Sequence, residues 1–390
     1  MRHNPAVRLP LRSQRRVHIV TFPIGGRGGL PGHARLRGRA TGIGDSTRWT
    51  RRERLFLQQG LTSGCTIRGD RHGDMAKPRA ISLFSGCGGS DLAVQNRGFD
   101  IVWANDIWDV ACETYRDNIP NPKIEEGDIA TFREFPPADL LVGCYPCQGY
   151  SQGGRRDPDE SINFLYRQFD RVLRLVEPKA FVVENVNGMA YGANRKLLEN
   201  QLCRFRLAGY RVVWQVLNAR DYGAAQNRRR VFLVGIRSDI PATYSFPPPT
   251  HGPNGSTDYV TQKDVISGMP KWPEGEFNNE KFHWYYLSRN RRRGWNEQSP
   301  CLVGHWRHVP LHPISPPLKR IDTDHWRFSR RGRARRLSYR ECAALQGFPR
   351  SFVWKRGSVR ERFQMIGNAV PPPLFAAVLR GLDGLWNWPN

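Results

Sequence analysis

The feature that most constrains the fold is a regular alternation of apolar runs and helical patterns between residues 79 and 236. The runs are apolar on both faces, which is typical of strands that helices cover from both sides. This pattern predicts an α/β protein with a doubly wound, mostly parallel sheet. The expected strands are 80–84, 101–104, 139–143, 180–183, 211–217 and 231–236, and the expected helices include 108–118, 161–175 and 194–208.

A cysteine and a glutamate each follow one of these strands. Cys147 comes shortly after the run 139–143, and Glu184 comes directly after the run 180–183. Ligands of doubly wound sheets bind at the carboxyl ends of the strands, so we expect the two side chains to lie close together. A thiolate that adds to a ring carbon and an acid that neutralises the adjacent nitrogen can together activate an electron-poor ring.

A glycine-rich turn at 84–89 follows the first strand and opens a helix, for which Ser90 is the expected N-cap. Glycines allow a ligand to approach the backbone closely. Asp106 ends the second strand, where an acid binds ribose hydroxyls in doubly wound folds. Asp128 is an expected acceptor for an adenine amino group, and the alternative for both acids is an exposed loop carboxylate without a ligand.

The turn matches neither G-x-x-x-x-G-K-[ST] nor G-x-G-x-x-G, the patterns that bind di- or triphosphates. A ligand with adenosine but without a pyrophosphate fits better. S-adenosylmethionine is such a ligand.

The charge of the chain indicates a polyanionic partner. The formal net charge is +25 over 390 residues, and nucleic acid is the simplest partner for such a chain. About fifteen arginines and four acids lie before residue 77, which puts roughly +11 in that segment. No apolar run reaches the length that spans a membrane, so no membrane partner is expected.

The eight cysteines are scattered along the chain. Only Cys144 and Cys147 form a C-x-x-C, and without a second ligand pair no metal site is expected. The setting that this pattern predicts is a reducing interior without structural disulfides. Cys203 and Cys342 lie in helical patterns and are expected to be small core residues.

Composition divides the chain into four segments. Residues 1–76 are rich in Arg, Gly and Pro, and we expect them to be a disordered extension. For this extension a DNA-binding tail, a transit peptide and an upstream translation artefact are the alternatives, the last because Met75 directly precedes the first strand. Residues 77–236 carry the strand and helix alternation, 237–335 are loop-rich and basic, and 336–390 return to helical patterns, with a capping box at Ser338 and Glu341.

Taken in order, the motifs are similar to those of the DNA (cytosine-5)-methyltransferase family, in its prokaryotic, restriction-modification form. The similarity covers nearly everything from Ala80 to the C-terminus, and the series is far more specific than any single block. The blocks are 84–89 (FSGCGG), 146–148 (PCQ), 184–186 (ENV), 226–230 (QNRRR), 340–349 (RECAALQGFP) and 367–371 (GNAVP).

This resemblance implies a role for each block. Cys147 would add to C6 of a cytosine, and Glu184 would hydrogen-bond or protonate N3 while charge builds at C5. Of Arg230 and Arg228, one would hold the base carbonyl and the other a phosphate. The implied fold is that of S-adenosylmethionine-dependent methyltransferases, with 237–335 as a smaller, loop-rich target-recognition domain. The residues implied to bind the cofactor are Phe84, Ser85, Gly86, Gly88, Gly89, Asp106, Ile107, Asp128, Asn368 and Val370.

The chain departs from the family pattern at three places. Tyr145 stands where many members have proline, Asp106 stands where glutamate is common, and Ile107 stands where an aromatic residue often covers the adenine. None of these changes removes a reacting group.

The expected activity is methylation of C5 of a flipped-out cytosine in a short duplex DNA sequence. The expected setting is a monomer at the nucleoid in the cytoplasm, with a cognate restriction endonuclease as a possible partner. Three alternatives stay open: a tRNA cytosine-5 methyltransferase, a catalytically silent DNA-binding relative, and a redox centre at Cys144 and Cys147.

Overall fold

The computed structural model describes residues 77–121, 123–146 and 164–386, all within one compact unit that spans 71–390. The predictions for the extension 1–76 and for the position of Cys147 lie outside the described residues. In the described part, no helix is both long enough and apolar enough to cross a bilayer.

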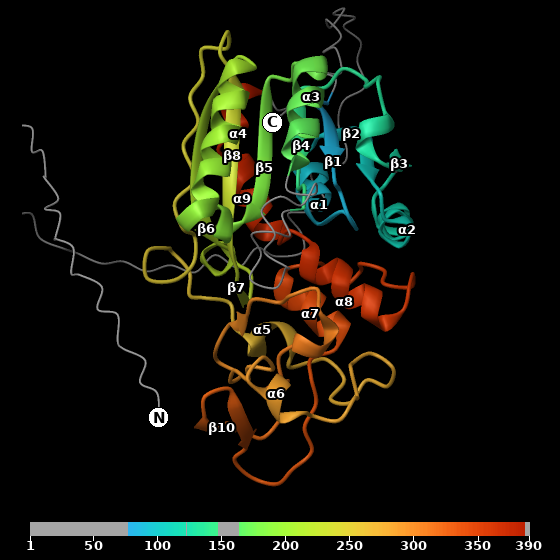
Figure 1. The fold of residues 1–390 in the computed structure, drawn as a ribbon, viewed down its shortest axis with the longest axis vertical. Coiled ribbons are helices and arrows are strands. Elements are labelled where there is room, and N and C mark those ends of the chain that lie inside the picture. Colours follow the sequence, from blue (N-terminus) through green and yellow to red (C-terminus); the bar gives the residue numbers. More distant parts are fainter. Residues whose placement is uncertain (1–76, 122, 147–163, 387–390) are drawn as a thin grey trace, which may run out of the picture. The chain divides into compact units, whose positions relative to one another are not determined.

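A seven-stranded sheet forms the centre of this unit (Figure 1). The four pairings from β3 to β5 are parallel, whereas β8 runs antiparallel to both β5 and β6. The sheet is therefore mostly parallel, which confirms the α/β fold class. In spatial order its strands are β3 (Ile124–Glu126), β2 (Asp100–Asp106), β1 (Arg79–Leu83), β4 (Leu140–Gly143), β5 (Ala180–Val186), β8 (Arg229–Arg237) and β6 (Tyr210–Asn218).

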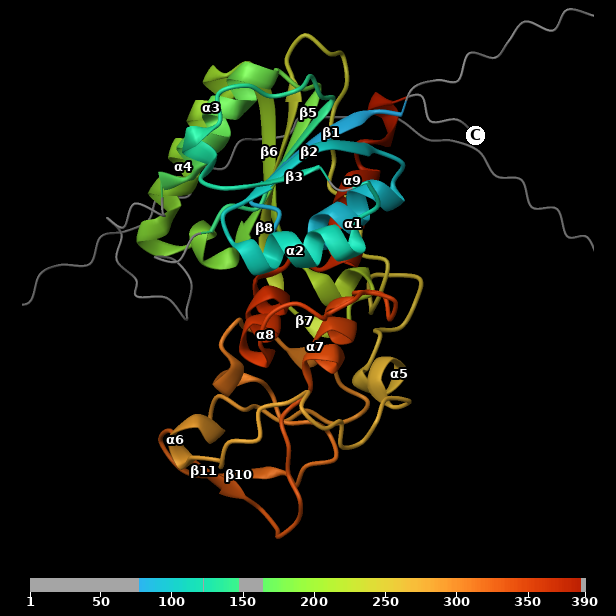
Figure 2. The same cartoon turned by 90° about the vertical axis from the view of Figure 1, so that its right-hand side faces the viewer.

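Helices cover both faces of the sheet (Figure 2). One face packs against α3 (Tyr166–Val176) and α4 (Arg195–Leu207), and the other against α1 (Gly89–Asn96), α2 (Asp109–Asn118) and α9 (Pro372–Arg380). Successive side chains of a strand point to opposite faces of the sheet. Ile81 therefore lies in one apolar cluster and its neighbour Ala80 in the other. Burial on both faces explains why the strands read as continuous apolar runs.

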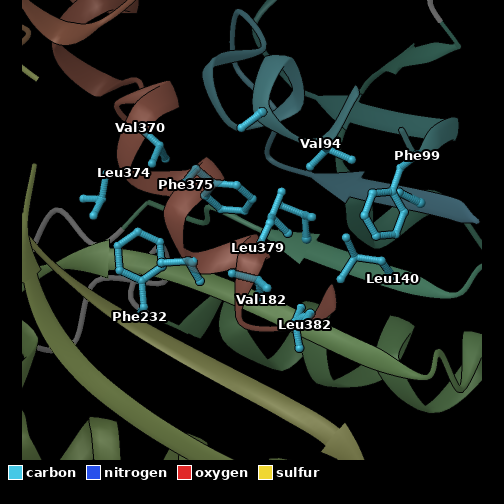
Figure 3. Packing of buried hydrophobic residues seen from close by; sticks show 14 of the residues in the cluster. Val94, Phe99, Leu140, Val182, Phe232, Val370, Leu374, Phe375, Leu379 and Leu382 are labelled. Atoms are coloured by element: carbon cyan, nitrogen blue, oxygen red, sulfur yellow. The ribbon is translucent and has the colours of Figure 1, made fainter. Parts of the chain in front are cut away.

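The C-terminal helix packs directly on the sheet (Figure 3). Phe375 of α9 lies against Phe232 of β8, with 6.1 Å between the ring centroids. The amphipathic pattern of residues 371–386 predicts a single helix that is entered through prolines, and prolines do lie in the first turn of α9. The helix ends at Arg380, and a separate 3-10 helix follows at Asp383–Leu385, so the prediction of one helix up to Trp386 is too long.

The region from 238 to 338 contains only short elements, in keeping with its irregular sequence. A third apolar cluster joins this region to α7 and α8 and to Cys87 of the glycine turn. The helices and strands of this region are α5 (Gln262–Ile266), α6 (Trp284–Leu287), β9 (Ser299–Pro300), β10 (Leu318–Asp322) and β11 (His325–Phe328). It is flanked by β7 (Gln226–Asn227) on one side and by α7 (Tyr339–Gln346) and α8 (Val359–Asn368) on the other. Further 3-10 helices lie at Ile129–Thr131, Asn187–Ala190, Gly192–Asn194, Ala219–Tyr222 and Trp306–His308.

The structure confirms some of the predictions for helix caps and cysteines and corrects others. Ser338 and Glu341 form the expected capping box at the start of α7. Ser90 is not the N-cap of α1: Gly88 takes that position with φ 92°, so the turn ends earlier than predicted and Ser90 is the second helical residue. Cys342 is buried as expected, whereas Cys203 is exposed on α4, which corrects that prediction.

Candidate active site

The glycine turn and Asp106 are joined by hydrogen bonds. The backbone N–H of Gly86 donates to Oδ2 of Asp106 over 2.8 Å, and that of Trp108 donates to Oδ1 over 2.9 Å. A carboxylate oxygen has two lone pairs, so each still has an acceptor position for a ribose hydroxyl. A side chain built at Gly86 would meet no atom within 4 Å, so open space lies beside the turn.

Two further predicted residues lie beside Asp106 at this edge of the sheet. Ile107 follows it and is 72 % exposed. Asp128 follows β3, where the preceding Gly127 donates its N–H to the carbonyl of Asp106 over 3.0 Å. Asp128 is exposed, and its Oδ1 accepts the N–H of Ala130 over 2.9 Å. The three residues therefore lie near one another at the carboxyl ends of β2 and β3, beside the glycine turn.

The C-terminal block 367–371 closes the other side of the turn. A Cβ atom at Gly89 would lie 2.7 Å from the carbonyl oxygen of Val370, so only glycine permits this approach. Val370 is buried, and Asn368 is exposed at the end of α8. Phe84, with φ 58°, and the buried Ser85 shape the start of the turn.

Glu184 and Arg230 form a nearly buried ion pair on adjacent strands. Nε of Arg230 lies 2.9 Å from Oε1 of Glu184, and the side chains are 11 % and 8 % exposed. Burial raises the pKa of the Glu184 carboxyl above its usual range, although Arg230 and Arg228 counteract the rise. This environment favours a carboxyl group that can hold or donate a proton.

A pocket of about 570 Å³ opens next to this pair. Arg230 lies in its wall and Glu184 does not, so the ion pair meets this space, which is large enough for a nucleobase, through the arginine. The lining of the pocket also includes residues between Arg291 and Val303, on both sides of β9 in the sequence. The lining residues are Val186, Asn187, Gly188, Arg220, Asn227, Arg229, Arg230, Arg291, Arg293, Asn296, Glu297, Gln298, Ser299, Pro300, Cys301 and Val303.

Arg228 is placed differently from Arg230. It is 1 % exposed and is absent from the pocket lining, and its guanidinium donates to the carbonyls of Leu302 and Gly367 over 2.7 and 2.8 Å. The structure therefore buries a side chain for which the family resemblance implies a contact with the base or a phosphate. It lies behind the pocket rather than in it.

Cys147 lies outside the described residues, but the segment leading to it is held next to Glu184. Asn185 donates its side-chain N–H to the carbonyl of Tyr145 over 3.1 Å. The hydroxyl of Tyr145 donates to Oε1 of Gln201 over 2.5 Å. The backbone two residues before Cys147 is thus fixed beside the end of β5.

Sequence reasoning missed several residues around this pocket. Cys301 lies in the wall, where Arg228 and Arg230 lower the pKa of its thiol despite burial. Arg220 also lines the pocket, and Gln226 and Gln346 form hydrogen bonds beneath it. The two glutamines belong to family blocks, but nothing in their local sequence indicates that they meet.

The fold and this strand-end site define an α/β enzyme of the methyltransferase type. The family model for C-5 cytosine-specific DNA methylases matches residues 79–383. The chain belongs to this family and is a DNA (cytosine-5)-methyltransferase, as its motifs predict.

Individual relatives agree with this assignment. Type II methyltransferase M.BsuRI of Bacillus subtilis is 36 % identical over 342 residues, covering 77 % of this chain and 78 % of the relative. Type II methyltransferase M.NgoPII of Neisseria gonorrhoeae is 36 % identical over 318 residues, covering 75 % and 92 %. The crystal structure of the Schizosaccharomyces pombe Dnmt2 methyltransferase has a TM-score of 0.59 at 19 % identity, covering 79 % and 99 %, which confirms the fold.

Proposed function

We propose that this enzyme transfers a methyl group from S-adenosylmethionine to C5 of a cytosine flipped out of a short, specific duplex DNA sequence. The observation that carries the proposal is the nearly buried pair of Glu184 and Arg230 beside a pocket of nucleobase size. Enclosing a base there requires that it leave the duplex, because stacked bases do not expose the ring faces.

The residues around the glycine turn fit the proposed cofactor. Gly86 leaves open space for a ligand, and the remaining acceptor positions of Asp106 suit ribose hydroxyls. Asp128 would accept the adenine amino group, Ile107 would cover the ring, and the block with Asn368 and Val370 would contact the methionine part. When bound, S-adenosylmethionine supplies an electrophilic methyl group on a sulfonium.

The chain's own residues would prepare the base for this transfer. The thiolate of Cys147 bonds to C6, and the electron pair displaced from the C5–C6 bond makes C5 nucleophilic. Glu184 donates a hydrogen bond or a proton at N3, for which its raised pKa is suited. Arg230 orients Glu184 and would hold the base carbonyl. After methylation, loss of the C5 proton and expulsion of the Cys147 thiolate restore the aromatic ring.

We assign DNA recognition to residues 237–335, the catalytic and cofactor-binding domain to 77–236, and the closing helices to 336–390. The recognition segment carries arginines whose forks suit guanine edges and phosphates. Arg291 and Arg293 are exposed in the pocket wall, whereas Arg292 between them donates to the carbonyls of Pro313 and Ser315. Arg291 and Arg293 are thus more exposed than Arg292, although Nη1 of Arg293 also lies 3.4 Å from Oε1 of Glu297.

The relatives named as type II methyltransferases support a role in restriction-modification. We propose that the enzyme acts as a monomer on nucleoid DNA in the cytoplasm and protects it from a cognate endonuclease. Bisulfite sequencing of DNA from a host that expresses the chain tests this proposal. We expect one short sequence context to be fully methylated. Absence of 5-methylcytosine in DNA, or methylation of tRNA instead, would refute it.

A further inference from the structure

A chain of buried hydrogen bonds connects the cofactor side of the site to the pocket wall. We propose that Gln226, Arg228 and Gln346 are positioning residues that couple cofactor binding to the shape of the base pocket. This inference rests on the proposed function and deepens it, because it assigns a task to three residues that do not line the pocket.

Arg228 makes the central contacts. One terminal nitrogen donates to the carbonyl of Leu302 over 2.7 Å, and the other donates to those of Gly367 and Ala369 over 2.8 and 3.0 Å. Leu302 stands between Cys301 and Val303, which both line the pocket. Gly367 and Ala369 lie in the block that reaches the glycine turn. A single guanidinium therefore holds both segments.

Gln226 and Gln346 connect the same two segments by a second route. Gln226 accepts the backbone N–H of Leu302 over 3.0 Å, and its side-chain N–H donates to Gln346 over 3.0 Å. Gln346 in turn donates to the carbonyls of Ile366 and Ala369 over 2.7 and 2.6 Å. Both glutamines are 0 % exposed. Buried polar groups of this kind hold one arrangement, since any shift leaves a donor or acceptor unpaired.

The connected segments also touch directly. A Cβ atom at Gly367 would lie 2.2 Å from the backbone nitrogen of Gly304 and 2.4 Å from the carbonyl carbon of Val303. On the cofactor side, a Cβ atom at Gly89 would likewise lie only 2.7 Å from the carbonyl oxygen of Val370. A ligand that presses on the glycine turn can therefore displace the pocket wall through this closely packed path.

The charge of Arg228 suits a positioning role. Burial and the charge of Arg230 lower its pKa to about 10, so the guanidinium keeps its charge at neutral pH. Its terminal nitrogens are occupied by backbone carbonyls, so Arg230 lines the pocket and Arg228 does not. Lysine at position 228 would retain the charge but could not span three carbonyls, because an ammonium lacks the planar fork.

The test measures linkage between the two sites in the full chain. Binding of S-adenosylhomocysteine is titrated by calorimetry with and without a duplex that the wild-type enzyme methylates. We expect the duplex to tighten binding about tenfold in the wild type, within the usual range of coupling between sites. In Arg228→Lys and Gln346→Leu the factor should fall below about threefold. Arg230→Lys should lose turnover but keep the wild-type factor.

Glycine variants give an independent comparison. Gly367→Ala should also reduce the coupling, whereas Gly268→Ala is the matched control, because the nearest atom to its added Cβ is Nη2 of Arg350 at 4.0 Å. Thermal melts identify variants that fail to fold, and if Arg228→Lys unfolds, Gln346→Leu decides. Wild-type coupling in folded Arg228→Lys or Gln346→Leu would overturn the inference. If the wild-type enzyme methylates DNA but shows no coupling, only this inference fails; if it methylates no DNA, the proposed function fails first.

Discussion

Arg230 and Glu184 approach each other across two antiparallel strands, with 2.9 Å between Nε and Oε1. The pair lies almost entirely out of water, so the carboxyl depends for its charge balance on Arg230 and, behind it, on Arg228. Removing one member of such a pair leaves an uncompensated charge, which costs more than the pair contributes. Burial raises the pKa of the Glu184 carboxyl, whereas the neighbouring arginines lower it.

Glu184→Gln should lower kcat by about 100-fold or more, because glutamine can donate a hydrogen bond but has no proton to transfer. In the wild type, activity should fall as pH rises through the raised pKa of Glu184, since the protonated form is the active one. This alkaline decline should be absent in the variant. Initial rates between pH 5 and pH 9 provide the measurement, and an unchanged profile would contradict the acid role.

Cys147→Ser should abolish turnover while duplex binding persists, since serine is a much weaker nucleophile. The wild-type enzyme should form a covalent complex with duplex DNA containing 5-fluorocytosine, because fluorine replaces the proton that must leave C5. Denaturing gels measure this complex. Cys203→Ser, at an exposed position on α4, is the control. Equal loss of activity in Cys144→Ser and Cys147→Ser would instead favour the redox interpretation.

Asp91 lies in the first turn of α1, and burial raises its pKa from 3.8 to about 7. The folded state therefore holds a proton that the unfolded state releases, and stability falls as pH rises from about 4 to about 7. For this group the loss is up to about 4 kcal/mol. Asp91→Asn stays neutral and should lack this dependence. Urea unfolding at pH 4.5, 6 and 8 compares the two proteins; parallel curves would show that the carboxyl is already ionised in the fold.

Gly235 of β8 faces the ring of Phe181, and an added Cβ would lie 2.1 Å from Cε1. Gly235→Ala should therefore lower the free energy of unfolding by about 1–3 kcal/mol through overpacking. Gly268→Ala, with open space around its Cβ, should change it by less than about 1 kcal/mol. Chemical denaturation measures both, and equal effects would mean that Phe181 moves aside without cost.

Local sequence predicts much of the site because its residues lie in or near the ends of strands. The apolar runs before Glu184 and before Asp106 lie in β5 and β2. Asp106 ends β2 as predicted, whereas β5 continues three residues beyond the predicted run 180–183 to Val186, so Glu184 lies within the strand rather than after it. Ser338 with Glu341 likewise forms the predicted cap, because a capping box depends on residues three apart. The prediction for Ser90 fails because the left-handed Gly88 caps the helix two residues earlier, and both residue types are common N-caps.

The sequence alone determined the family, the fold class and the placement of Glu184 near the carboxyl end of a strand, since these depend on periodicity and on short motifs. Arg228 and Arg230 stand two residues apart in one block. Only the tertiary structure decided that Arg230 lines the pocket and that Arg228 is buried. Arg228 precedes β8, so the alternation of a strand does not fix where its side chain lies. Its partners Leu302 and Gly367 are 74 and 139 residues away, and contacts at such separations arise only when the chain has folded.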